Sequence, residues 1–380
     1  MVDPSRRATW THTALAQQVA FGVGALDRLP ELVRTIGARQ AMLVTTPGRV
    51  ASVEGEAVVR KLGRTLTSTF AEVRSHVPTP IVQAAVQQAR RDGVDLIVSF
   101  GGGSCADLGK AVAYFLEQEA GIPGASHLDR PLLPHIAIPT TYSGAELTPF
   151  FGMTDPNTRQ KGGGGGPTCA PRAVLYDPLL TTSTPARVSA ETGMNALAHC
   201  VEAAWSPTRS PESEAIALHG AAVLHRALPG VVDDPADLAA RTEVLEGAFL
   251  AGRCLANAGM GVHHGLAQLV GGRTGIPHGL ANAVLLAHCV RFNAEVVPEA
   301  VEAIGRALGR PDDPAGAVDD LRARLGLPAT LAEAGVPEEE LDAVARLSQG
   351  NRTIAGNPRP VSEDDARAIL EAAWAGPELA

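Results

Sequence analysis

The chain has 380 residues and a formal net charge of -9, and 45% of its residues are hydrophobic. This length is typical of about two domains, and the apolar content is ample for two buried cores. The acidic balance argues against a nucleic-acid partner, because nucleic-acid recognition needs a basic surface. No apolar run approaches the ~20 residues needed to span a bilayer, and the N-terminus lacks a signal-peptide core. We therefore expect a cytoplasmic protein with no membrane partner.

Short apolar strands alternate with helices in the first half of the chain. Strands are predicted at 41–46, 95–100 and 135–141, with helices between them at 54–62 and 80–92. This alternation is typical of a parallel sheet wrapped by helices. Residues 1–182 are therefore predicted to form an α/β nucleotide-binding domain.

The second half has a different character, because strands disappear after Tyr176. Long helices are predicted at 189–205, 211–228 and 235–258, and further helices follow towards the C-terminus. The segment TTSTP near 182–185 supplies a turn and a helix start. Residues 183–380 are therefore predicted to form an all-helical domain.

Glycines follow the second predicted strand in the segment FGGGSCADLGKA. Gly101, Gly102 and Gly103 let the backbone approach a pyrophosphate, and a helix beginning near Ser104 offers free N–H groups and a positive dipole end. The spacing is neither G-x-G-x-x-G nor a Walker loop. A tight structural turn is therefore an alternative for this motif taken alone.

Small hydroxyl residues follow the third predicted strand, at the edge where α/β sheets bind their ligands. Thr140, Thr141 and Thr148 could hydrogen-bond a nucleotide, and Tyr142 could face the nicotinamide or the substrate. Helix-capping hydroxyls are an alternative interpretation of this motif in isolation.

A run of five glycines at 162–166 directly follows Lys161. Such a run is typical of a flexible loop, and we expect a loop tip with no direct role. The alternative is a lid, in which the Lys161 cation closes on a cofactor phosphate or an acidic substrate.

The segment TGMNALAH places Asn195 and His199 four residues apart, on one face of a predicted helix. His264 and His278 follow further along the chain. A carboxylate at position 195 would complete a set of one Asp and three His, which suits iron or zinc. Asn is a neutral, weak ligand, so we expect weakened metal binding at a site built on a metal-site template.

The set and order of these motifs resemble the group III, iron-containing alcohol dehydrogenase superfamily along nearly the whole chain. PTTY, Asn195, the adjacent His263 and His264, and the late Asn357-Pro358 pair are similar to its maleylacetate reductase branch. The resemblance implies the dehydroquinate synthase-like fold. In that fold an α/β dinucleotide-binding N-terminal domain and an all-helical catalytic domain enclose an active cleft.

The resemblance also assigns site residues. Cofactor contacts fall on Gly101, Gly102, Gly103 and Ser104 for the pyrophosphate, and on Thr140, Thr141, Thr148 and Lys161 for the rest of NAD(P)H. The superfamily's metal positions fall on Asn195, His199, His264 and His278, with His263 out of register.

Two positions depart from the superfamily pattern. Gln268 stands where many members have an additional His, and an amide cannot shuttle protons as imidazole does. Thr46 stands where related enzymes often carry an Asp that grips the adenosine ribose and repels a 2′-phosphate. NADPH should therefore be tolerated alongside NADH.

The reaction that the resemblance implies is NAD(P)H-dependent reduction of maleylacetate to 3-oxoadipate, or of a related unsaturated keto acid, in the breakdown of aromatic compounds. Hydride addition to the β-carbon leaves an enolate. We expect His199, His264, His278 and the Asn195 amide to donate hydrogen bonds to it, and a histidine proton to complete the reduction.

An acidic substrate also needs a cation. Arg273, between two of the histidines, could anchor a substrate carboxylate through its bidentate fork, with a surface arginine as the alternative. A homodimer is expected from the family.

Other functions remain open from the sequence. One is a metal-dependent alcohol dehydrogenase that uses Asn195 as a poor Fe²⁺ or Zn²⁺ ligand. A second is a non-redox lyase or cyclase, since dehydroquinate synthase shares the general fold. A third is a binding or scaffolding subunit that has lost catalysis, with Gln268 as the first symptom.

Overall fold

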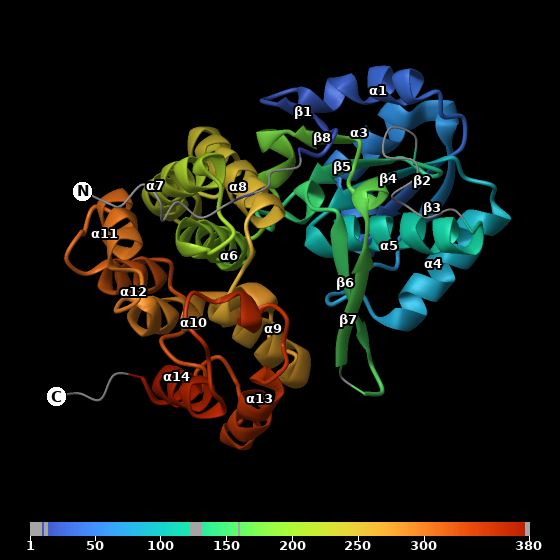
Figure 1. The fold of residues 1–380 in the computed structure, drawn as a ribbon. Helices are drawn as coiled ribbons and strands as arrows, with labels where there is room; N and C mark the ends of the chain where they lie inside the picture. The colour runs from blue at the N-terminus through green and yellow to red at the C-terminus, as the bar shows by residue number, and fades with distance from the viewer. Residues whose placement is uncertain (1–9, 11–13, 122–130, 159, 377–380) are drawn as a thin grey trace.

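The computed structural model describes residues 10, 14–121, 131–158 and 160–376. The first half contains a six-stranded sheet in the order β1-β8-β5-β4-β2-β3, whose strand pairs are all parallel. Its strands are β1 (Gln18–Phe21), β2 (Ala41–Thr45), β3 (Leu66–Phe70), β4 (Leu96–Gly101), β5 (His135–Pro139) and β8 (Ala173–Tyr176). An antiparallel hairpin of β6 (Phe150–Asp155) and β7 (Gln160–Gly165) projects from this half (Figure 1).

Helices cover both faces of the sheet. Successive strand residues point to opposite faces, so each strand contributes to both layers of packing. In β4, Leu96 and Val98 belong to a core with α1 (Leu29–Ile36) and α3 (Val53–Leu62). Ile97 belongs to the opposite core, with α4 (Thr79–Arg91) and α5 (Gly103–Glu119). Burial on both faces explains the continuous apolar sequence of these strands. The predicted parallel sheet wrapped by helices is confirmed.

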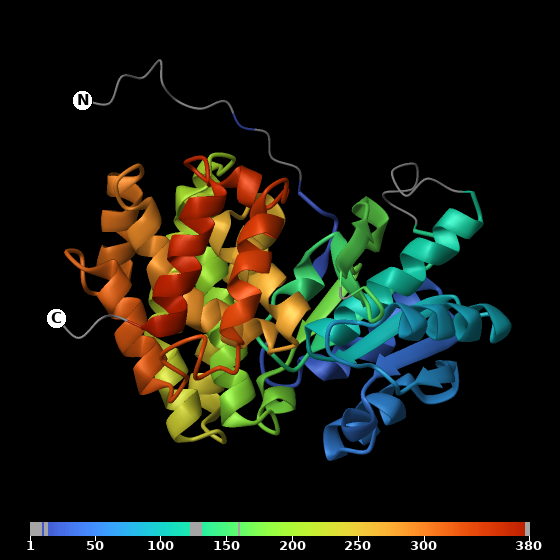
Figure 2. The ribbon, with the colours of Figure 1, turned by 90° about the horizontal axis from the view of Figure 1, so that it is seen from below.

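The second half is helical, and its described residues contain no strand after Tyr176. Its helices are α6 (Ala186–Trp205), α7 (Pro211–Asp233), α8 (Leu238–Asn257), α9 (Val262–Thr274), α10 (His278–Asn293), α11 (Pro298–Ala307), α12 (Pro314–Arg324), α13 (Leu341–Ser348) and α14 (Glu363–Ala375). One core joins α6, α7 and α8 with α10, α11 and α12, and a second joins α9 and α10 with α13 and α14. Figure 2 shows this half packed beside the sheet.

Helix α7 is, by length and composition alone, apolar enough to be a candidate membrane span. It packs against α6 and α8, and Leu224, Leu228 and Val231 on it belong to the buried core. A core helix of a globular protein therefore accounts for its apolar sequence.

The glycine run forms a strand, so the prediction of a flexible loop is wrong. Residues 162–165 pair with β6. A side chain at Gly163 would lie 2.2 Å from the Phe151 carbonyl oxygen, and one at Gly164 would lie 3.0 Å from the Phe151 ring and 3.1 Å from the Tyr114 ring. Glycine is therefore required here by close packing, and Lys161 stands on a paired strand instead of a free loop.

The carboxyl ends of β2, β4 and β5 share one edge of the sheet, because all three strands are parallel neighbours. The loop after β5 meets the helical half directly. A side chain at Gly144, whose φ is 72°, would lie 2.8 Å from the Gly252 Cα on α8. The edge where α/β sheets bind ligands therefore lies at the junction of the two halves.

Candidate active site

The two glycine and hydroxyl segments predicted from sequence lie against each other. A side chain at Gly102 would come within 3.1 Å of the Thr141 Oγ1, and one at Gly103 within 2.7 Å of the Ser143 Oγ. Gly101 has a φ of 145°, and a side chain there would lie 2.5 Å from the Cys105 Sγ. The structure thus brings the two segments together. We call the surface that they form the glycine cradle, and at its three glycines there is no space for a side chain.

This cradle fits the pyrophosphate and sugars of a dinucleotide. Helix α5 begins after Gly102 without a side-chain cap, so the first-turn N–H groups around Ser104 can meet an anion. The Thr140 and Thr141 hydroxyls are buried and have no hydrogen-bond partner among the described residues. Buried polar groups without partners are uncommon and indicate a missing ligand or water.

Thr148 lies in the same loop, but its hydroxyl is already engaged. It accepts a hydrogen bond from the Lys110 Nζ at 3.0 Å and donates to the Ala145 carbonyl at 2.9 Å. Both Thr148 and Lys110 are buried. These bonds show that Thr148 fixes the shape of the loop, and its contact with the cofactor stays a prediction.

Thr46 follows β2, and its hydroxyl accepts the Arg49 backbone N–H at 3.2 Å, which caps α2 (Pro47–Val50). The Arg49 guanidinium reaches across to the domain junction, where it donates to the Ser183 and Thr184 hydroxyls at 2.7 and 2.6 Å. Arg49 thus places a cation near the end of β2, three residues after Thr46.

Tyr142 does not face the cleft, so its predicted contact with nicotinamide or substrate is wrong. The side chain is fully buried, and its hydroxyl accepts a hydrogen bond from the Arg241 Nη1 at 3.1 Å. Arg241 also donates to the Ser189 hydroxyl at 2.7 Å and the Thr184 carbonyl at 2.9 Å. Tyr142 therefore belongs to a buried polar cluster that joins the two halves.

The three predicted histidines come together from three helices, with Asn195 and His199 on α6, His264 on α9 and His278 at the start of α10. The His199 and His264 rings stack with centroids 4.5 Å apart and planes inclined by 21°. The His264 and His278 rings are 6.1 Å apart. His278 is half-buried, and the other members of the set are buried.

The Glu202 carboxylate, which was not predicted from the sequence, binds to this cluster and holds His264 in place. It is fully buried. Its Oε1 accepts the Gly261 and His263 backbone N–H groups at 2.9 and 3.1 Å, and its Oε2 lies 2.6 Å from the His264 Nδ1. Glu202 stands three residues after His199 on the same helix, and this spacing was the available signal.

The hydrogen bonds assign the proton positions of the neutral rings. The His263 Nε2 lies 2.9 Å from the Asn282 carbonyl oxygen, which only accepts, so Nε2 carries the hydrogen and Nδ1 a lone pair. The His264 Nδ1 faces that lone pair at 3.3 Å as well as Glu202, so it carries the hydrogen. The His264 Nε2 then points a lone pair into the site. His264 cannot donate to an oxyanion until it gains a proton, which corrects the prediction.

The electrostatics of the cluster follow from burial. Burial, reinforced by His264, lowers the pKa of His199 well below its ordinary value, and burial with the nearby Lys161 does the same for the pKa of His278. Burial also lowers the pKa of His264, partly offset by Glu202. Burial alone would raise the pKa of Glu202, but hydrogen bonds from His263 and His264 outweigh it and hold that pKa well below its usual range. The cluster is therefore an ionised carboxylate among neutral rings.

The donor set fits a divalent metal poorly. The Asn195 Oδ1, His199 Nδ1, His264 Nε2 and His278 Nδ1 are buried without partners, but none of them is an anion. Stacked rings direct their in-plane lone pairs along separate lines, whereas zinc needs nitrogens at ~2.0–2.1 Å around one point. Within the described ranges, only Glu202, His263 and His264 bring ligand atoms within 4.8 Å of one another, and those atoms already bond each other.

Arg273 points away from the histidines. It lies nine residues after His264 on α9, which is about two and a half turns and therefore the opposite face. Its Nε pairs with the Glu340 Oε2 at 2.5 Å. The predicted role of Arg273 as a substrate anchor is therefore wrong. Gln268, one turn after His264, is half-buried on the side of the cluster.

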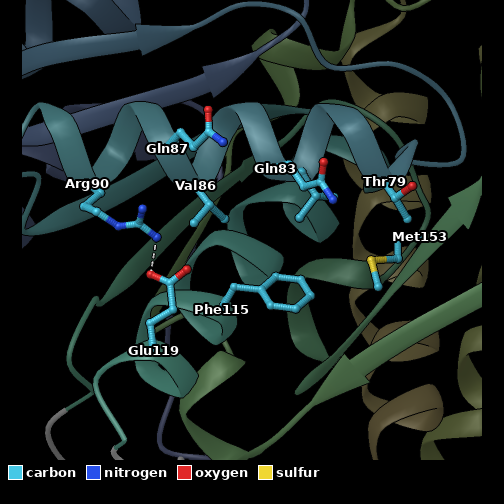
Figure 3. A pocket seen from close by; sticks show the side chains of 9 residues that line it. Thr79, Gln83, Val86, Gln87, Arg90, Phe115, Glu119 and Met153 are labelled. Atoms are coloured by element: carbon cyan, nitrogen blue, oxygen red, sulfur yellow. Dashed lines mark hydrogen bonds and ion pairs between the residues drawn. The ribbon is translucent and has the colours of Figure 1, made fainter.

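A separate pocket of about 410 Å³ lies between α4, α5 and β6, and Figure 3 shows its lining. Val86, Phe115 and Met153 give it apolar walls, and the Arg90–Glu119 ion pair closes one side. It contains none of the residues that the sequence assigns to the site. The glycine cradle and the histidine cluster, at the junction of the halves, remain the candidate active site.

Comparisons with known proteins agree with this arrangement. Residues 16–178 match the family model described as iron-containing alcohol dehydrogenase, and residues 189–374 match its C-terminal counterpart. The chain is 36% identical over 359 residues to a maleylacetate reductase of Burkholderia cepacia, covering 94% of this chain and 96% of that protein. It is 35% identical to a maleylacetate reductase of a Rhizobium species, covering 97% and 98%.

A solved structure is similar over the same length. The crystal structure of maleylacetate reductase from Agrobacterium tumefaciens superposes with a TM-score of 0.85 at 33% identity, covering 97% of this chain and 98% of that one. The chain therefore belongs to the iron-containing alcohol dehydrogenase family, in its maleylacetate reductase branch.

Proposed function

We propose that this protein is an NAD(P)H-dependent reductase that reduces the carbon–carbon double bond of maleylacetate, or of a related unsaturated keto acid, with 3-oxoadipate as the product from maleylacetate. The observation that carries the proposal is the pairing of a dinucleotide cradle with a buried Glu202–His264 couple at one domain junction. Similarity to maleylacetate reductases over nearly the whole chain supports the substrate.

The chain's own groups would hold the cofactor, which when bound supplies the hydride. The N–H groups around Gly103 and Ser104 receive the pyrophosphate at the start of α5. The unpartnered Thr140 and Thr141 hydroxyls receive sugar or phosphate oxygens. Lys161 on β7 adds a cation beside the cleft; partial burial lowers its pKa, and the charge of Asp107 offsets part of that effect.

The histidine cluster handles the charge and the proton. Hydride addition to the β-carbon of the enone moves an electron pair onto the conjugated carbonyl oxygen. The Asn195 amide and the His199 and His278 rings can donate hydrogen bonds to that oxygen. The neutral His264 first takes up a proton from water at its Nε2, the ionised Glu202 stabilises the resulting imidazolium, and that proton is then delivered to the enolate. One hydride and one proton give the saturated product.

We propose that this chemistry proceeds without a metal, because an enolate is a softer anion than an alkoxide and hydrogen-bond donors suffice to stabilise it. The uncharged donor set at Asn195, His199, His264 and His278 supports this. A metal-dependent alcohol dehydrogenase is the alternative, and metal removal separates the two.

The proposal predicts oxidation of NADH or NADPH, followed at 340 nm, when freshly generated maleylacetate is added to the protein. The rate should be unchanged after treatment with a chelator and should not rise when Fe²⁺ or Zn²⁺ is returned. Loss of activity on chelation that the metal restores would favour the alcohol dehydrogenase. Absence of turnover in every condition would overturn the proposal.

Glu202→Gln should lower kcat for maleylacetate about 100-fold or more, the usual range for losing a general acid–base group. The amide oxygen can still accept the backbone N–H groups at the start of α9, but the amide NH₂ no longer stabilises a proton on His264. Stopped-flow measurement of hydride transfer tests this. Glu246→Gln, at an exposed position of α8, is the control, and an equal effect of both variants would contradict the role.

Arg49→Ala should raise KM for NADPH about 10-fold with little effect on KM for NADH. The reason is that Arg49, on the short helix that follows β2, is the cation proposed to meet a 2′-phosphate, and alanine removes that charged hydrogen bond. Steady-state kinetics with both cofactors measure this. Arg60→Ala, an exposed site on α3, is the control. An equal rise for both cofactors would refute selective phosphate contact.

We also propose that the protein is a cytoplasmic homodimer formed through the edge strand β1, with no nucleic-acid or membrane partner. Val19 and Phe21 on β1 and Val23 just after it are exposed, at 36%, 42% and 58%, and an apolar strand at the edge of the sheet invites pairing. Light scattering should give about twice the chain mass of 39.3 kDa. Phe21→Lys should shift the mass towards the monomer, whereas Leu347→Lys on α13 should not. A monomeric wild-type protein would refute the proposal.

A further inference from the structure

Two consecutive residues, His76 and Val77, hold a backbone conformation that side chains rarely adopt. Their φ angles are 62° and 45°, and they are the non-glycine residues with positive φ in the described part of the chain. For a β-branched valine this is a marked outlier. Such strain persists only where the surroundings impose it, and it gathers at functional sites.

The surroundings here are β6 and the sheet core. The Val77 carbonyl accepts the Thr154 N–H at 3.2 Å, and Pro78 forms a bridge with the same residue. The Val77 side chain is 2% exposed and belongs to the core that contains α4 and α5. Burying Val77 therefore fixes where the neighbouring His76 ring is placed.

His76 faces the histidine cluster across the domain junction. A side chain built at Gly271 would lie 4.0 Å from the His76 Cε1 and 4.0 Å from the His278 Cα. Gly271 is seven residues after His264, about two turns along α9 and thus on the same face. His76 is half-buried, and its ring nitrogens have no hydrogen-bond partner among the residues described.

Lys161 stands on β7 of the hairpin, and this strand contacts α9. It is the register partner of Thr154, the residue bonded to Val77. Burial lowers the pKa of both His76 and His278, and the Lys161 charge adds to this effect.

Asp107 is the carboxylate whose charge acts on Lys161 and raises its pKa, against the larger effect of burial, which lowers it. The Asp107 carboxylate accepts from the Lys110 Nζ at 2.8 Å and the Gly152 N–H at 3.2 Å. No carboxylate in the described ranges pairs with Lys161 itself. The face between His76, Lys161 and His278 therefore offers hydrogen-bond donors and a positive charge to an anion.

We propose that His76 binds one carboxylate of the substrate together with Lys161, and so makes the enzyme selective for diacids. The inference rests on the proposed function and replaces Arg273, whose guanidinium is paired with Glu340. A neutral imidazole N–H donates one hydrogen bond to a carboxylate oxygen, and the Lys161 ammonium supplies the opposite charge.

The test uses His76→Gly and His76→Asn, since glycine and asparagine tolerate positive φ best and both variants should fold. KM for maleylacetate should rise about 10- to 100-fold in His76→Gly, the usual effect of losing a hydrogen bond to a charged group. The Kd for NADH should not change. His76→Asn, which keeps a short amide donor, should show a smaller rise. His219→Asn, at an exposed position of α7, is the matched control.

A binding measurement keeps this inference separate from the proposed reaction. Calorimetry on the complex with NAD⁺ would compare adipate with monomethyl adipate, which has the same chain and one negative charge fewer. Wild-type protein should prefer the diacid, and His76→Gly should lose most of that preference. An undiminished preference in His76→Gly, or a wild-type protein with no preference, would overturn the inference. A preference that depends on His76 in a protein that does not reduce maleylacetate would overturn only the reaction.

Discussion

The geometry of the site depends on the buried Glu202 carboxylate. A charge without contact with water is stable only when hydrogen bonds replace its hydration, and here backbone and ring N–H groups do so. The backbone donors belong to the first turn of α9, whose N–H groups have no partners within the helix. One side chain of α6 therefore sets where α9 starts, which way His264 points, and where the open position at Gly271 lies.

The side chain at position 195 contributes less to the packing of the helices than the side chain at position 202 does. The Asn195 Oδ1 has no hydrogen-bond partner among the described residues, so a change of side chain there alters the site without breaking the helix packing. Removing Glu202 would leave several buried donors unsatisfied. A scaffold of this kind can exchange metal chemistry for hydrogen-bond chemistry at one position while the acid–base couple behind it stays in place.

Much of the fold could be predicted from the sequence, because buried strands, helix periodicity and glycine-rich strand ends are local patterns. The convergence of His199, His264 and His278 could also be predicted, but only through the family resemblance. Side-chain direction was harder. Arg273 lies nine residues after His264, and this spacing already implies opposite faces of one helix. Glu202 lies three residues after His199, which places it near the same face of α6. Both signals were present in the spacing.

Other features depend on tertiary neighbours that no local pattern contains. The glycine run is a strand because the rings of Tyr114 and Phe151 lie against it, and composition alone favours a loop. Tyr142 follows a strand end as binding residues do, but the distant Arg241 draws its hydroxyl into the core. The positive φ of Val77 has no sequence signal, since a β-branched residue strongly disfavours it.

Arg241 has a further consequence for how ligands reach the cleft. It is fully buried, and no described carboxylate pairs with it; its guanidinium bonds only neutral oxygens. Together with Arg49 and Lys161 it adds cations to the domain junction, where Glu202 is the ionised carboxylate, inside a molecule whose net charge is -9. A dinucleotide and a diacid are both anions, so the protein as a whole repels them at long range while the junction attracts them. Salt at physiological strength screens charges beyond ~8 Å. The long-range repulsion between the protein and these anions is therefore weak in the cell, and the charges at the junction determine how well the anions bind.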